Sequence, residues 1–184
     1  MNIKYIPIFL FCFAHVVYAA EPTNPELRSE LLRYKDIDQT SLKMGLREDM
    51  LRVVQREHSK RLRKIANKFG WPSITMVGKD GSQAAWLLVQ HADADPVWQA
   101  EALKMMTGLV ASDEVNRPDV AYLTDRLLSN AHKPQMYGTQ GTCIGKEMWR
   151  PDDIAEPDNV ERRREHMKMS TLKDYVAFGI WSNV

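Results

Sequence analysis

Three short motifs place polar, chemically competent side chains beside apolar ones. They are WLLVQHAD at residues 86–93, AYLTDR at residues 121–126 and QMYGTQ at residues 135–140. Burying a polar group without a partner costs on the order of a few kcal/mol. No motif can satisfy all of its own polar groups, so we expect the three motifs to meet in one shared polar cluster. This cluster is the candidate functional site.

Acid–base chemistry in such a cluster would centre on His91. Leu87 and Leu88 lie one helical turn before it, which predicts a largely buried imidazole. Asp93 follows where this helix must end, so both side chains can face one opening. Asp125 could orient His91, fix its tautomer and raise its basicity. The sequence leaves two structural alternatives open: a satisfied core histidine, and an internal ion pair of Asp125 with an arginine or with His91.

Other polar side chains of the motifs suit ligand binding. Neutral amides and hydroxyls around Gly138 could hold a polar ligand such as a sugar or a peptide, and they could equally form a structural turn. The predicted binding residues are Gln90, Arg126, Gln135, Tyr137, Thr139 and Gln140.

The His91-x-Asp93 spacing also raises the question of a metal site, since imidazole and carboxylate are common ligands. The nearest third ligand, Asp95, precedes Pro96 in the pattern of a helix cap. No HExxH or CxxC motif supports a metal site, so we predict neither a metal nor a cofactor.

Cys143 could act as a nucleophile with His91, but nothing near it in the sequence would activate the thiol. A small apolar loop residue is the simpler interpretation of this cysteine.

The first 19 residues have the pattern of a secretory signal peptide. Lys4 precedes an apolar run over residues 6–17, which is shorter than the roughly 20 residues that span a membrane. Val17 and Ala19 occupy the −3 and −1 positions of a cleavage site. The sequence predicts export to the periplasm or the medium, with an uncleaved N-terminal anchor as the alternative. The mature domain at residues 20–184 would have no stable membrane insertion.

The charge balance gives no reason to expect nucleic acid as a partner. The chain has 25 Lys and Arg against 24 Asp and Glu, and loss of Lys4 with the signal would leave the two equal. A basic excess between residues 43 and 68 indicates a solvated helix face or a contact with an anionic envelope surface. Only Cys143 would remain after cleavage, so the mature fold cannot depend on an internal disulfide.

Apolar spacing predicts a mainly α, compact single-domain helical bundle with a small β-hairpin or irregular loop near residues 135–150. An extended segment is expected at residues 73–77. Helices are expected at residues 25–34, 42–69, 82–92, 97–110, from 116 onward, 158–167 and 171–178. The apolar stripe of the second helix places His58 in the core; it comprises Leu51, Val54, His58, Leu62, Ile65 and Phe69.

The motifs, in this order, resemble an uncharacterised bacterial domain family with no assigned activity. The resemblance runs from Glu57 to Tyr175 through RLRKIANKFGWP, VG, AAWLLVQHADADPVWQ, AYLTDRLL, QMYGTQ and WRPDDIAEPDNVERRR…LKDY. Cys143 lies outside the family pattern, and His58 stands where relatives more often carry asparagine. The resemblance implies that these positions belong to the pattern: Trp71, Pro72, Trp86, Gln90, His91, Asp93, Asp95, Gln99, Asp125, Arg126, Gln135, Tyr137, Gly138, Thr139, Gln140 and Arg163.

Two classes of function fit these observations. One is a binding or interaction module, in which the cluster is a pocket for a polar ligand or protein partner, or a structural network. The other is an exported hydrolase acting on a polar envelope or extracellular substrate, with His91 as the base and Asp125 or Asp93 as its orienting partner. The lack of a recognised catalytic signature favours the module. A cleft opening onto His91 would favour the hydrolase.

Overall fold

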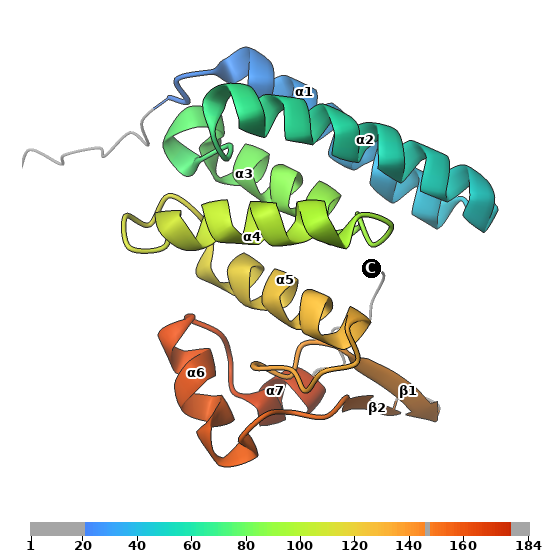
Figure 1. The fold of residues 1–184 in the computed structure, drawn as a ribbon, viewed down its shortest axis with the longest axis vertical. Helices are drawn as coiled ribbons and strands as arrows, with labels where there is room; N and C mark the ends of the chain where they lie inside the picture. Colours follow the sequence, from blue (N-terminus) through green and yellow to red (C-terminus); the bar gives the residue numbers. More distant parts are fainter. Residues whose placement is uncertain (1–20, 146–147, 178–184) are drawn as a thin grey trace, which may run out of the picture.

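The computed structural model describes residues 21–145 and 148–177, so the predicted signal peptide lies outside the described residues. Successive long helices run in alternate directions (Figure 1). In the described part of the chain these are α1 (Pro25–Lys43), α2 (Glu48–Phe69), α3 (Ile74–Gln90), α4 (Pro96–Leu109) and α5 (Arg117–Asn130). The elements that follow are β1 (Gly141–Gly145), β2 (Met148–Pro151), the 3₁₀ helix η1 (Pro157–Asn159), α6 (Val160–His166) and α7 (Leu172–Ala177).

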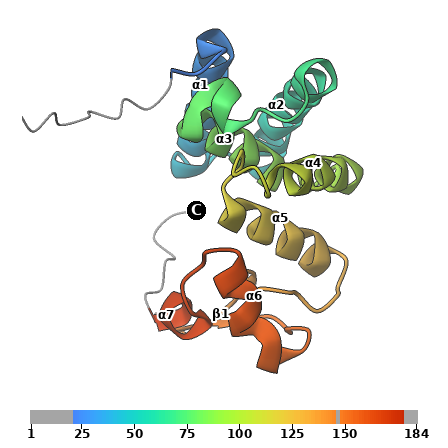
Figure 2. The same cartoon turned by 90° about the vertical axis from the view of Figure 1, so that its left-hand side faces the viewer.

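The predicted mainly helical single domain with a small β element is confirmed. Strands β1 and β2 pair antiparallel, with Gly141 opposite Pro151. The carboxyl-terminal elements lie on the far side of α5 from α1 and α2 (Figure 2). Among the described helices, none combines the length and the apolar character needed to cross a membrane.

Side-chain caps fix the start of several helices. The side chain of Asn24 accepts the N–H of Leu27 at the start of α1 (3.0 Å). The predicted Asp95 cap is confirmed, because its carboxylate accepts the N–H of Trp98 (3.0 Å) at the start of α4. Ser73 caps α3 in the same way. Each cap satisfies a backbone donor that the first helical turn leaves free.

The extended segment predicted at residues 73–77 is wrong, because most of it forms the first turn of α3. Gly78 then interrupts the helix with φ 75° and ψ 167°, a conformation that suits glycine. The interruption frees the carbonyl groups of Thr75 and Met76. They accept hydrogen bonds from the backbone N–H groups of residues 23–24 (3.1 and 2.8 Å), so the chain before α1 supplies the partners that the kink removes.

The predicted boundary between the first two helices is also wrong. α1 continues nine residues beyond Tyr34, and α2 begins at Glu48 rather than near Leu42. Gly45, with φ 61°, makes the turn between them. The longer α1 carries Asp38 on its buried side, in line with Leu27 and Leu31. This extension adds a buried carboxylate to α1.

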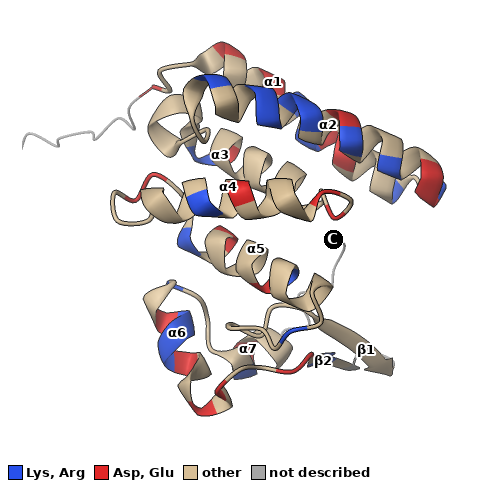
Figure 3. Cartoon of the chain, viewed as in Figure 1, with Lys and Arg blue, Asp and Glu red and all other residues tan. Residues whose placement is uncertain are grey.

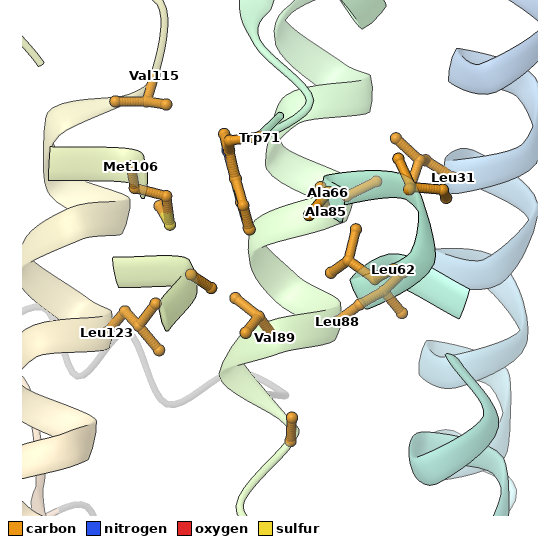
Figure 4. Packing of buried hydrophobic residues seen from close by; sticks show 14 of the residues in the cluster. Leu31, Leu62, Ala66, Trp71, Ala85, Leu88, Val89, Met106, Val115 and Leu123 are labelled. Carbon is orange, nitrogen blue, oxygen red and sulfur yellow. The ribbon is translucent and has the colours of Figure 1, made fainter. Parts of the chain in front are cut away.

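The hydrophobic core surrounds α3, which packs against α1 and α2 on one side and α4 and α5 on the other. Trp71 lies at its centre, near Ala85 and Val89 of α3 (Figure 4). The predicted stripe of α2 is confirmed at its middle, where His58 and Leu62 are buried. It is wrong at the end of the helix, because Phe69 is 43% exposed.

Candidate functional site

His91 forms a close pair with an acidic residue of α1. Its Nδ1 lies 2.7 Å from Oδ2 of Asp38, and the two side chains are 8% and 1% exposed. An ionised carboxylate can only accept hydrogen bonds, so Nδ1 of the imidazole carries the shared hydrogen. In the neutral ring this leaves Nε2 as acceptor and base. Nε2 has no hydrogen-bond partner among the described residues.

A cleft of about 920 Å³ lies between α2 and residues 91–95, the segment that joins α3 to α4. His91, Asp93 and Asp95 line it from this segment. The opposite wall is the polar face of α2, including Ser59 and Arg63. His91 is therefore held by Asp38 and is also one of the residues that line the cleft.

A second histidine adjoins this pair. His58 on α2 is 6% exposed, and its ring centroid lies 4.8 Å from that of Tyr34. Burial lowers the pKa of His58, and the charge of Asp38 opposes this effect without reversing it. Nδ1 of His58 and Oδ1 of Asp38 are both buried, and neither has a hydrogen-bond partner among the described residues. Position 58 thus belongs to the same polar cluster as Asp38.

Asp93 connects the cleft to α5. Its Oδ1 accepts Nδ2 of Asn130 (2.9 Å) and Nε2 of Gln99 (3.2 Å), and it lies 3.8 Å from Nε of Arg126. No hydrogen bond joins Asp93 to His91 within the described residues. Gln90, also a predicted binding residue, is 5% exposed, and its Oε1 has no partner in the described part of the chain. The side chains of Asp93 and Arg126 therefore join the first two motifs.

Asp125 holds the third motif rather than His91. Its carboxylate accepts the backbone N–H groups of Met136 (2.7 Å), Tyr137 (3.1 Å) and Thr139 (3.0 Å), together with the Thr139 hydroxyl (3.0 Å). Burial raises the pKa of Asp125, while these hydrogen bonds to its oxygens oppose the rise. A carboxylate with this many donors is fully engaged in ordering the loop.

Two arginines of α6 hold the carbonyl side of the same loop. Nε of Arg163 donates to the carbonyl of Met136 (2.7 Å), and Nη1 of Arg164 donates to that of Tyr137 (2.6 Å). Arg164 is 1% exposed, and burial lowers its pKa. The carboxylate of α5 therefore accepts hydrogen bonds from the N–H groups of the loop, and the two arginines of α6 donate hydrogen bonds to its C=O groups.

The amide side chains of this loop also serve the fold. Nε2 of Gln135 donates to the carbonyls of Gln140 (2.8 Å) and Asp152 (3.0 Å), and its Oε1 accepts the N–H of Gln140 (2.8 Å). Nε2 of Gln140 donates to Oγ1 of Thr139 (3.0 Å). Gln135 and Thr139 are buried. The arrangement is that of a structural turn, which was the second interpretation of these residues.

The structure brings the predicted residues together in two places rather than one. Asp93 of the cleft meets Arg126 of α5. Asp125 of the same helix instead contacts the backbone of the third motif. The partner of His91 is Asp38, which lay beyond the predicted first helix and was missed. Helical spacing carries the signal for it, since position 38 continues the buried row of Leu27 and Leu31.

Neither a metal group nor a thiol site appears in the part of the chain that is described. Residues 21–145 and 148–177 contain no set of three His, Cys, Asp or Glu side chains arranged to hold a metal ion. Cys143 is exposed on β1 as a free thiol and does not line the cleft.

The chain belongs to DUF6624, a family of unknown function whose model matches residues 25–180. The predicted family resemblance is thus confirmed, and the match begins at α1, so it includes Asp38 as well as His91. Comparisons with curated proteins and with solved structures found no match.

Proposed function

We propose that this protein is a binding module for a polar ligand, and that the ligand occupies the cleft between α2 and residues 91–95. One observation carries the proposal: His91 is fixed through Nδ1 by a buried carboxylate, while it lines an open cleft. A histidine held in one orientation beside a cleft provides a directed hydrogen-bonding group for a ligand. The polar wall of α2 provides further groups on the opposite side.

The contacts of the cleft favour binding over covalent catalysis. Ser59 is the hydroxyl residue among the described lining residues, and no hydrogen bond joins it to His91. An activated serine requires that bond. Cys143 does not line the cleft. A nucleophile paired with the imidazole is therefore lacking among the described residues.

A hydrolase remains the second candidate, and both the Asp38–His91 pair and the cleft beside His91 favour it. A carboxylate on Nδ1 fixes the tautomer in which Nε2 is the acceptor, and a base at that position could activate water without a protein nucleophile. The orienting residue in this mechanism would be Asp38, in place of Asp125 or Asp93. Chromogenic glycoside, ester and peptide substrates test the mechanism. Turnover by the parent and its loss in His91→Asn would establish catalysis.

Thermal denaturation with added probes tests the binding function. The probes are neutral and acidic oligosaccharides and tripeptides, measured with the parent, His91→Asn and the control His166→Ala. Asparagine can still donate to Asp38 while removing Nε2, and His166 is exposed on α6. A probe at 100 times its Kd stabilises the folded state by about 2.7 kcal/mol. We expect the resulting shift in Tm to be reduced in His91→Asn alone. Equal shifts in all three proteins would refute the cleft as the site.

We also propose that the chain is exported and cleaved after Ala19. The charged start, the apolar run and the small residues at the cleavage position support this proposal. N-terminal sequencing of protein from the periplasm or medium tests it, with residue 20 expected first. An intact Met1 in the membrane fraction would instead establish the N-terminal anchor.

A further inference from the structure

The wall that α2 contributes to the cleft is strongly basic. Four lining cations follow one another at intervals of four residues, so they share one face of the helix. They are Arg52, Arg56, Lys60 and Lys64. Figure 3 shows the basic residues spaced along α2. With Arg63, five cations line the cleft against three acids, Glu48, Asp93 and Asp95.

The acidic side chains of the cleft are already engaged. Asp93 accepts hydrogen bonds from Gln99 and Asn130. Asp95 caps α4, and its Oδ2 lies 3.3 Å from Nη2 of Arg63. The two aspartates therefore do not neutralise the row of cations on α2.

Two cations of the row are available to a ligand. Arg52 pairs with Glu48, and Lys60 pairs with Glu57 (2.8 Å). Arg56 and Lys64 are exposed and form no ion pair with a described residue, although their charges help to lower the pKa of Glu57. They are eight residues apart, about 12 Å along the helix axis. A ligand that satisfies both must carry anionic groups at separated positions.

Beside the cations runs a second row at the same helical interval, in which Arg63 is accompanied by neutral hydrogen-bonding groups at Gln55, Ser59 and Asn67. Amides and hydroxyls match the hydroxyl groups of a sugar. The described lining residues include no Phe, Tyr or Trp, so stacking on a large aromatic ring does not supply the affinity. Charge and hydrogen bonding must supply it instead.

We infer that the cleft binds an acidic oligosaccharide, with carboxylates at Arg56 and Lys64 and sugar hydroxyls at the neutral groups of the second row. A volume of about 920 Å³ accommodates a ligand of several units. The inference rests on the proposed function, since it names the ligand class of the same cleft. It requires no net positive charge on the whole chain, because the cations are concentrated on one helix.

Isothermal titration of the mature chain tests the inference. The probe is a hexagalacturonate, and the neutral comparison is maltohexaose, an oligosaccharide with the same number of units. Arg56→Ala/Lys64→Ala removes two cations without leaving a carboxylate unpaired. Lys104→Ala/Arg162→Ala is the matched control, since both residues are exposed on helices, form no ion pair with a described residue and do not line the cleft.

We expect hexagalacturonate to bind the parent and maltohexaose to bind much more weakly. The cleft double variant should bind hexagalacturonate about tenfold more weakly, and the control double variant should match the parent. Affinity should also fall as salt rises to about 0.2 M, where the Debye length is below roughly 10 Å.

Several outcomes would overturn the inference. Equal binding of the neutral oligosaccharide, lost in His91→Asn, would keep the cleft as the site while excluding an acidic ligand. Equal losses in both double variants would show a general charge attraction. Tighter binding of a single-stranded DNA oligonucleotide would replace the saccharide by nucleic acid. Absence of hexagalacturonate binding would refute the acidic oligosaccharide and leave the binding function to its own probes.

Discussion

Asp38 and His91 are separated by 53 residues in the sequence, and their side chains meet at 2.7 Å. The contact joins the second half of α1 to the residue that ends α3. It therefore ties together two helices that already pack on each other, at the place where the cleft begins. The same hydrogen bond that orients the imidazole also satisfies a carboxylate that is 1% exposed. The pair therefore contributes both to the candidate site and to the stability of the fold.

Removing His91 should destabilise the protein. In His91→Ala, the Asp38 carboxylate keeps the amide of Gln39 (3.2 Å) as its one hydrogen-bond partner within the described residues. A buried acceptor that loses its partner costs about 1–3 kcal/mol. Urea denaturation of His91→Ala, Asp38→Asn and the double variant measures the coupling of the two side chains. We expect the double variant to lose less than the sum of the single losses, and strict additivity would contradict a direct interaction.

Asp125→Asn should disorder the loop of the third motif. The asparagine amide presents an NH₂ group to backbone N–H groups that now point at a carboxylate, so donors face donors. We expect a loss of about 3 kcal/mol in the free energy of unfolding. Hydrogen exchange should lose protection at residues 136–139. Asp153→Asn is the control, because Asp153 is exposed. Retained protection in Asp125→Asn would show that the arginines alone hold the loop.

Gly138→Ala should be far more harmful than Gly108→Ala. Gly138 has φ 71°, and an added Cβ would lie 2.9 Å from Cδ1 of both Ile154 and Leu172. Strain and overpacking together should cost about 2–4 kcal/mol. Gly108 lies on α4 with no atom near an added Cβ, so alanine should stabilise it by about 0.5–1 kcal/mol. Thermal denaturation of the two variants measures the contrast. Similar Tm values would refute the tight packing around Gly138.

Local signals predicted much of the fold. The Asp95 cap and the core position of His58 follow from residue type and helical spacing. The first turn of α3, at residues 73–77, could not be predicted in this way. Its β-branched residues favour a strand, whereas the Ser73 cap and the packing of Val77 favour a helix. A local preference is weak when a buried residue and a cap act against it.

The partners of the site residues were harder to predict. His91 was expected to be buried beside an acid, and it is, but the acid lies on α1. Pairing between distant helices depends on how they pack, which no spacing within one motif can specify. Asp125 was expected to need a partner, and its partners are backbone N–H groups. Every residue except proline carries such a group, so residue types alone could not identify them.

Asp119 should make the stability of the protein depend on pH. It is 5% exposed near the start of α5, and burial raises its pKa to about 7, against a hydrogen bond from Asn116 (2.8 Å) that lowers it. The N-terminal position on the helix also works against the rise. The folded protein therefore holds this proton more tightly than the unfolded chain, whose aspartate has the ordinary pKa of 3.8. The contribution of Asp119 to the free energy of unfolding is present below pH 3.8 and is lost as the pH rises through about 7.

Asp119→Asn removes this titration while keeping an oxygen that accepts from Asn116. The variant should match the parent near pH 4 and exceed it at pH 8, by up to about 4 kcal/mol, since each pKa unit corresponds to about 1.4 kcal/mol. Urea denaturation between these pH values measures how the free energy of unfolding of the parent and of the variant changes with pH. Asp158→Asn, a change at an exposed position of η1, should keep the slope of the parent. A lower stability of Asp119→Asn at pH 8 would mean that the folded protein stabilises the charged carboxylate, and this would contradict a raised pKa of Asp119.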